Sequence, residues 1–360
     1  MKKQKIFVRC FLPVLVGIAC VISVVMVVPV VVFCGEKNEG QSALVPYSSF
    51  SCFIHKKMSC ERHLSRSLGL DGVAAEERTV RPLSLLDAAI LGVVEGATEY
   101  LPVSSTGHLL LTENILGIAN DPESKRAANA YAIVIQAGAI LAVLGLYRNR
   151  IRQMLLGLIG RDADGQRLVL NLLIAFMPAV VLGLVLEDVI KAHLFGLWPV
   201  TAAWFAGGIF LLFLGRRQYQ TLSGLSIEAF GWRQALGIGL IQCMALWPGV
   251  SRSLATIAGG LLMGAQLVPA VEFSFLLGLI TLGAATVYET QQNGSLIVAN
   301  FGLTGPLVGF FCAFVSAWVS IKWMVSFLQR RGLAVFGWYR IVLALVVAAA
   351  LLTGVGGLHP

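Results

Sequence analysis

Residues 91–108 read LGVVEGATEYLPVSSTGH and give the clearest indication of how this chain folds. An apolar run with two carboxylates breaks at Pro102, because proline disrupts a helix interior, and resumes after three hydroxyl side chains. A second stretch, residues 239–256, reads GLIQCMALWPGVSRSLAT. It has the same plan, an apolar run, a break at Pro248 and a hydroxyl-rich restart. We therefore predict an internal repeat in which each copy contains one broken helix.

The two copies align without a gap, so that Glu95 falls on Gln242 and Ser104 falls on Ser251. Three apolar runs that are long enough to cross a bilayer separate them, at 127–147, 168–186 and 198–215. Because an odd number of crossings reverses the direction of the chain, the second copy enters from the opposite face. This is the inverted-repeat plan, with two re-entrant helix hairpins that meet near the bilayer midplane.

The composition places the whole chain in a membrane. Of 360 residues, 57% are hydrophobic and only 13% are charged, with a mean hydropathy of +0.80. Soluble domains carry roughly 25% charged residues, so soluble enzymes and nucleic-acid-binding proteins are excluded. Further apolar runs occur at 273–288, 304–321 and 341–352, without β-barrel alternation. The predicted fold class is all-α, a polytopic helical membrane protein whose surroundings are the lipid bilayer.

The net charge of +8 lies in short Lys and Arg clusters rather than along one face. Four of these clusters fall on the same side of the membrane when the crossings are counted: 148–152, 161–167, 216–217 and 330–331. An excess of Lys and Arg marks the cytoplasmic side of membrane proteins. The first hairpin is therefore expected to enter from the outer face.

The chain divides into three parts by composition. Residues 1–35 have a basic start and an uncharged run from Cys10 to Gly35, which favours a retained membrane anchor over a cleaved signal peptide. Residues 36–82 intersperse charges with Ser and Gly and are expected to be a flexible linker on the outer, periplasmic side of the membrane. Residues 83–360 form the membrane domain. An incorrectly assigned start codon is an alternative explanation of the first 82 residues.

Glu95 and Glu99 are one helical turn apart and project from the same face. A charged residue within the hydrocarbon layer costs about 2.5–3.5 kcal/mol on insertion scales, so the pair needs a compensating charge. The functional interpretation is a hard divalent cation, Mg²⁺ or Ca²⁺, bound by carboxylate oxygens. The structural alternative is an ion pair with Arg252.

The residues after each break suggest a phosphate or diphosphate site. A helix N-terminus attracts anions, and arginine binds phosphate oxygens through two donors at once. His108 is within helical reach of Ser104 and Ser105, an arrangement suited to general acid–base catalysis. We expect Gln242 to line the same pocket. The predicted substrate-binding residues are Ser104, Thr106, Gln242, Ser251, Arg252, Ser253 and Thr256, and the predicted catalytic residues are Glu99, Ser105, His108 and Arg252.

With these motifs, residues 84–352 resemble the undecaprenyl-diphosphate phosphatase family, the bacitracin-resistance proteins of the bacterial inner membrane. The resemblance rests on 91–108, on 242–253 with Thr256, and on 272–277. It implies a hydrolase that converts undecaprenyl diphosphate to the monophosphate and recycles the lipid carrier of peptidoglycan synthesis. It also implies a divalent cation and an active site open to the periplasm. A homodimer is left open.

The family motifs imply roles for individual residues. The acidic motif falls on Glu95 and Glu99 as metal ligands, and the phosphate-binding motif falls on 251–256 with Arg252 at its centre. Ser105 would attack the terminal phosphorus with His108 as proton shuttle, while water activated by His108 is the alternative nucleophile. Because inverted repeats with broken helices are typical of transporters, the alternative function is a lipid-phosphate flippase or an ion-coupled carrier.

Overall fold

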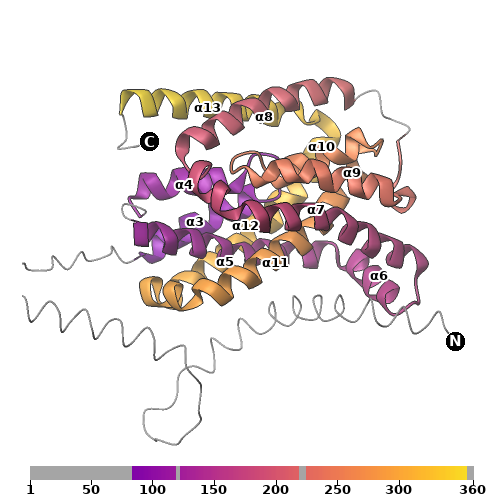
Figure 1. The fold of residues 1–360 in the computed structure, drawn as a ribbon, viewed down its shortest axis with the longest axis horizontal. Helices are drawn as coiled ribbons and strands as arrows, with labels where there is room; N and C mark the ends of the chain where they lie inside the picture. Colours follow the sequence, from indigo (N-terminus) through magenta and orange to yellow (C-terminus); the bar gives the residue numbers. More distant parts are fainter. Residues whose placement is uncertain (1–82, 119–121, 219–223, 355–360) are drawn as a thin grey trace, which may run out of the picture. The chain divides into compact units, whose positions relative to one another are not determined.

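The computed structural model describes residues 83–118, 122–218 and 224–354, so the predicted anchor and linker in 1–82 lie outside the described residues. The described residues form eleven α-helices and no strand, with a single isolated bridge between Leu225 and Ala265 (Figure 1). The helices are α3 (Leu85–Thr98), α4 (Ser105–Leu116), α5 (Pro122–Leu146), α6 (Arg148–Leu158), α7 (Ala163–His193), α8 (Leu197–Gln218), α9 (Trp232–Gln242), α10 (Arg252–Leu262), α11 (Leu267–Phe301), α12 (Thr304–Arg331) and α13 (Ala334–Thr353). The all-α fold class is confirmed.

Six of these helices are long and apolar enough to cross a membrane within the described ranges, and each contains one of the six predicted runs. They follow the two hairpins in the same way. The hairpin α3–α4 precedes α5, α7 and α8, and the hairpin α9–α10 precedes α11, α12 and α13. The short helix α6, between α5 and α7, was not predicted.

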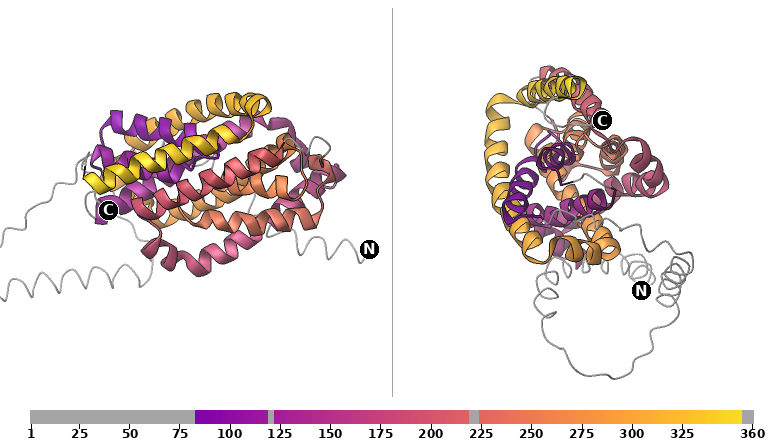
Figure 2. Two further views of the ribbon diagram at one scale, coloured as in Figure 1. Left: turned by 90° about the horizontal axis from the view of Figure 1, so that it is seen from above. Right: turned by 90° about the vertical axis from the view of Figure 1, so that its left-hand side faces the viewer.

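Helix pairing follows the repeat. The first helix of each hairpin packs against a long helix of the other repeat. Helix α3 packs on α12, and α9 packs on α7. The pairs α5–α11 and α8–α13 join corresponding helices, and the long helices run side by side (Figure 2). Small residues permit the closest of these contacts, since a Cβ at Gly92 or Gly96 would collide with a carbonyl oxygen of α12.

Each hairpin begins and ends at one end of the helical body. Residues from the start of α3, the loop after α4, the start of α5 and the end of α11 share one apolar cluster: Ala88, Ile118, Ala127 and Ile297. At the other end, Arg150 forms ion pairs of 2.7 Å with Glu228, just before α9, and with Glu272, at the start of α11. The two hairpins therefore enter from opposite ends, as the inverted repeat requires.

The breaks have the same backbone conformation in both copies. Ser104 (φ 74°) and Ser251 (φ 79°) are the two non-glycine residues with positive φ in the described ranges. Each caps the helix that follows it: Ser104 Oγ accepts from the amide of Gly107 at 3.4 Å, and Ser251 Oγ from that of Leu254 at 3.2 Å. Such backbone strain persists where the surroundings impose it, and it often marks a functional site.

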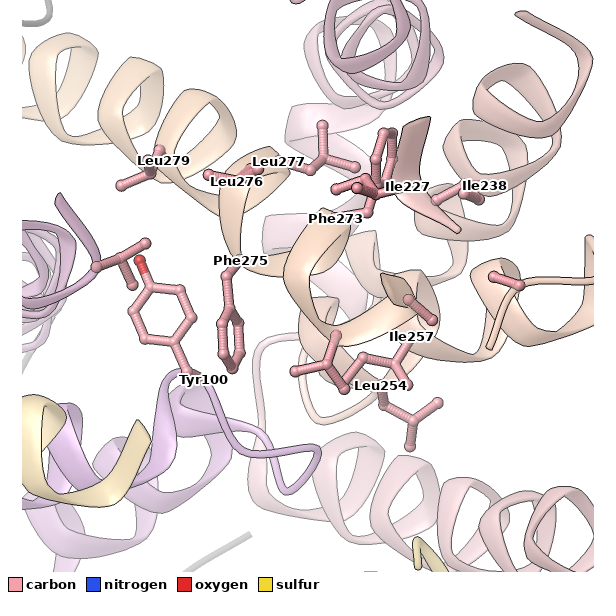
Figure 3. Packing of buried hydrophobic residues seen from close by; sticks show 14 of the residues in the cluster. Tyr100, Ile227, Ile238, Leu254, Ile257, Phe273, Phe275, Leu276, Leu277 and Leu279 are labelled. Atoms are coloured by element: carbon pink, nitrogen blue, oxygen red, sulfur yellow. The ribbon is translucent and has the colours of Figure 1, made fainter. Parts of the chain in front are cut away.

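The outward faces of the long helices are apolar. Leu184 and Val185 of α7 are 64% and 73% exposed, and α13 exposes Leu345, Val346 and Leu352. Exposed aliphatic residues of this density suit contact with lipid chains. The interior is filled by aromatic and aliphatic side chains, where Tyr100 from the first break packs edge-on against Phe275 of α11, with 5.2 Å between ring centroids (Figure 3).

Candidate active site

Glu99 joins the two repeats. It follows α3 directly, is buried, and accepts hydrogen bonds on both carboxylate oxygens. Oε1 accepts from Arg252 Nη2 at 3.0 Å, and Oε2 accepts from the Ser105 hydroxyl and, at 3.3 Å, from Gln136 Nε2 of α5. The structure thus brings together the acidic motif of the first copy and the arginine of the second.

Arg252 is the first residue of α10, and its guanidinium lies over the Tyr100 ring, 5.2 Å from the centroid. Besides the bond to Glu99, Nη1 donates to the carbonyl oxygen of Ser274 at 3.1 Å, whereas Nε has no partner among the described residues. A guanidinium has five N–H donors, so three are left for a ligand.

Glu95 is completely buried one turn before Glu99, and neither of its oxygens has a hydrogen-bonding partner among the described residues. Its repeat counterpart Gln242 is also buried, and both polar atoms of its amide lack partners there. Buried polar atoms are normally hydrogen-bonded, and an exception often indicates a missing water, ion or ligand. The two unsatisfied side chains are therefore candidates for ligand contact.

The carboxylate pair is compatible with a divalent cation. Glu95 and Glu99 interact electrostatically across one helical turn, and the oxygens of Glu95 are uncommitted. Within the described ranges no group of three or more His, Cys, Asp and Glu side chains is close enough to bind a metal. A cation here would take its remaining ligands from water and substrate, as Mg²⁺ does when one or two carboxylates and a phosphate bind it.

Two adjoining cavities reach this centre. One, of about 580 Å³, is lined by Glu95, Ser105, Thr106 and Gln136. The other, of about 510 Å³, is lined by Gln242 and Arg252 among mainly apolar residues. Both cavities include residues from the C-terminal part of α7 and from α11. A mostly apolar cavity with a few convergent polar groups is the usual form of a small-molecule site.

His108 lies on α4 but points away from Ser105. Its Nδ1 is 2.7 Å from the Ser104 carbonyl oxygen and its Nε2 is 2.7 Å from the Tyr339 hydroxyl. Among the hydrogen bonds of the described residues, none joins His108 to Ser105. The Ser105 proton therefore has Glu99 as its acceptor in this geometry, and the predicted proton transfer between Ser105 and His108 stays a prediction.

The remaining predicted hydroxyls differ in their surroundings. Thr106 is exposed and lines the larger cavity, whereas Ser253 and Thr256 are fully buried. Ser253 Oγ donates to the Leu101 carbonyl oxygen at 2.7 Å, and Thr256 Oγ1 is 2.6 Å from Ser274 Oγ. In this geometry Ser253 and Thr256 hold the second break against its neighbours, while Ser104 and Ser251 act as helix caps.

The sequence interpretation missed Arg340 and Gln136. Arg340 of α13 is fully buried, and its guanidinium donates to five carbonyl oxygens, those of Pro102, Ala203, Trp204, Gly249 and Val250. Three of these belong to the two breaks, so Arg340 holds them together. Arg340 lies directly before the last predicted run, 341–352. Gln136 was visible as a polar residue in the middle of the run 127–147.

Two oppositely directed broken helices around a buried Arg–Glu pair define a polytopic membrane protein with a polar site in its core. Comparison with known families agrees: the model described as "Bacitracin resistance protein BacA" matches residues 88–346. The chain belongs to this family.

Three relatives that are 44–46% identical to this chain are named undecaprenyl-diphosphatases. The chain is 46% identical to the undecaprenyl-diphosphatase of Sorangium cellulosum over 264 residues. This aligned region covers 72% of this chain and 84% of the relative. It is also 46% identical over 271 residues to undecaprenyl-diphosphatase 2 of Rhodospirillum rubrum, 75% of this chain and 96% of the relative. For the undecaprenyl-diphosphatase of Methylococcus capsulatus the identity is 44% over 262 residues, 73% and 93% of the two chains.

Proposed function

We propose that the Glu99–Arg252 centre, with Glu95 and Ser105, is the active site for hydrolysis of a lipid diphosphate. The chain is an undecaprenyl-diphosphatase, which converts undecaprenyl diphosphate to undecaprenyl phosphate and inorganic phosphate. This reaction recycles the lipid carrier of cell-wall synthesis and accounts for the bacitracin resistance in the family description. The observation that carries the site proposal is the hydrogen-bonded chain from Ser105 through Glu99 to Arg252.

Arg252 and the starts of α4 and α10 would bind the diphosphate. The three uncommitted N–H donors of Arg252 match phosphate oxygens, and both helices present their N-terminal amides near the breaks. Thr106 lines the cavity wall and would add a hydroxyl donor. The uncommitted amide of Gln242 faces the same centre from the second cavity and would contact the substrate there.

Ser105 would be the nucleophile. Its oxygen forms a bond to the terminal phosphorus while its proton passes to Glu99, the acceptor that it already contacts. The bond between that phosphorus and the bridging oxygen breaks, and undecaprenyl phosphate leaves. Water then attacks the phosphoserine with His108 as the base, the bond between phosphorus and the Ser105 oxygen breaks, and Glu99 returns its proton to Ser105 as phosphate is released. The competing route is direct attack by water, with His108 as the base.

Glu95 and Glu99 would hold a divalent cation, Mg²⁺ or Ca²⁺, whose contribution is to neutralise charge on the phosphate oxygens. Glu95 is suited to this because neither of its oxygens has a hydrogen-bonding partner among the residues that the structure describes. Because the Glu99 oxygens already accept from Ser105 and Arg252, Glu95 would supply most of the carboxylate binding.

The enzyme would face the periplasm from the bacterial inner membrane. The larger cavity is lined by Glu113 at the end of α4 and by Lys191 at the end of α7. This end is opposite to the one that holds Arg150 with Glu228 and Glu272. Because the basic clusters near Arg150 mark the cytoplasmic side, the cavity would open on the other side of the membrane.

The test is phosphate release from undecaprenyl diphosphate by the full chain in detergent, with Mg²⁺ or with EDTA. Arg252→Gln and Ser105→Ala are expected to lower kcat at least about 100-fold, as loss of a preorganised charge or nucleophile does. Arg167→Gln and Ser326→Ala, in exposed positions outside both cavities, serve as matched controls. If Ser105→Ala retained nearly full turnover, the covalent route would be wrong and the water route would replace it.

A further inference from the structure

The imidazole of His108 is fixed from three sides. Its ring stacks parallel to Tyr339, with 5.8 Å between centroids and 5° between planes, and meets the edge of Trp204 at 5.2 Å. The two ring nitrogens are each 2.7 Å from an oxygen, Nδ1 from the Ser104 carbonyl and Nε2 from the Tyr339 hydroxyl. These contacts restrict the His108 side chain to few rotamers.

The acceptor at Nδ1 determines the tautomer. A carbonyl oxygen only accepts hydrogen bonds, so Nδ1 must carry the proton. In the neutral imidazole Nε2 then has the lone pair, and the Tyr339 hydroxyl is the donor in their contact. The basic nitrogen of His108 is thus directed toward α13, and its one protein partner among the described residues is Tyr339.

The neighbouring residue fixes the position of Tyr339. Arg340 is fully buried and donates to carbonyl oxygens of both breaks, including Pro102 at 3.2 Å and Gly249 at 2.8 Å. A shift of α13 along its axis would break these bonds. The Tyr339 hydroxyl is therefore held at a constant place relative to the start of α4, although the Tyr339 side chain is itself 46% exposed.

We propose that Tyr339 is a positioning residue that orients the basic nitrogen of His108 through its hydroxyl, on a helix whose register Arg340 sets. The inference rests on the proposed function, in which His108 is the base that activates the attacking water. Hydrogen-bonding partners that orient a metal-bound imidazole usually contribute about 10–100-fold to function, and we expect an effect at the lower end of that range for Tyr339. Tyr339 acts through His108, so its effect exists only while His108 is present.

The experiment is a double-mutant cycle in the full-length protein with undecaprenyl diphosphate as substrate. Tyr339→Phe keeps the ring and removes the hydroxyl, and His108→Asn removes the imidazole. Tyr147→Phe, a residue between α5 and α6, removes the same atom elsewhere and is the matched control. We expect Tyr339→Phe to lower kcat about tenfold, with KM and melting temperature unchanged, and to have less than a twofold effect in the His108→Asn background.

The outcomes separate the two hypotheses. An equal loss from Tyr339→Phe in both backgrounds, or no loss in either, would overturn the positioning role of Tyr339 while the role of His108 stands. Full activity of His108→Asn would instead overturn the proposed role of His108 and, with it, the basis of the inference.

Discussion

Glu95 offers a test in which stability and activity should move in opposite directions. Glu95→Gln replaces a buried carboxylate whose oxygens have no hydrogen-bonding partner in the described part of the chain with a neutral side chain of the same shape. The homologous position of the second repeat already carries an amide, Gln242, so the shape is compatible with this fold. The substitution removes the charge that we propose binds the cation.

The magnitude follows from the burial of Glu95. A carboxylate at membrane depth costs about 2.5–3.5 kcal/mol on insertion scales, and a neutral amide costs less. We expect Glu95→Gln to stabilise the metal-free protein by about 2 kcal/mol, a rise in Tm of roughly 5 °C. Because a ligand that binds only the folded state stabilises it, adding Mg²⁺ should raise the Tm of the original protein but not that of the variant.

The assay is thermal unfolding in detergent, with EDTA and with Mg²⁺, beside phosphate release. Asp164→Asn is the matched control, since Asp164 is exposed, lies in neither cavity, and its 3.9 Å ion pair with Arg167 contributes at most about 1 kcal/mol. A Tm for Glu95→Gln below that of the original protein in EDTA would refute the reasoning, because it would mean that the carboxylate is satisfied. Equal Mg²⁺ responses of both proteins would remove Glu95 from the cation site.

Three further variants probe the surroundings of the site. Arg340→Met removes a donor to five carbonyl oxygens, three of which, those of Pro102, Gly249 and Val250, lie outside the helices, so we expect a loss of more than about 4 kcal/mol and little folded protein by size-exclusion chromatography. A monodisperse, stable variant would contradict this role of Arg340. Gly278→Ala places a Cβ 2.5 Å from Arg252 Nη1 and should raise KM at least tenfold in the phosphate assay, whereas an unchanged KM would show that Arg252 can move aside without effect. Arg150→Gln breaks ion pairs with Glu228 and Glu272, and the hydrogen bond to Glu272 is the main cause that raises the pKa of Arg150. Its Tm should fall with kcat intact, and a selective loss of kcat would place this ion-pair network in the reaction.

Features that depend on local chain order were predictable. The length of each apolar run, the proline break and the gapless match of Glu95 to Gln242 are properties of consecutive residues, and the six long helices and both broken helices follow from them. The matching positive φ of Ser104 and Ser251 confirms that aligned sequence produced aligned backbone. The convergence of Glu99 and Arg252 also followed from the repeat, since inverted hairpins must meet at their breaks.

The membrane class, the inverted repeat and the set of polar residues near its centre can all be read from the amino-acid order, because burial in lipid and helix breaking act on short segments. Which of these residues contact one another depends instead on how the helices pack. Ser105 donates to Glu99 rather than to His108, and His108 faces Tyr339, 231 positions along the chain. Arg340 reaches carbonyl oxygens 90 to 238 positions away. Hydrogen bonds depend on directions and distances of a few tenths of an ångström, which arise when helices pack and which residue spacing along one helix does not contain.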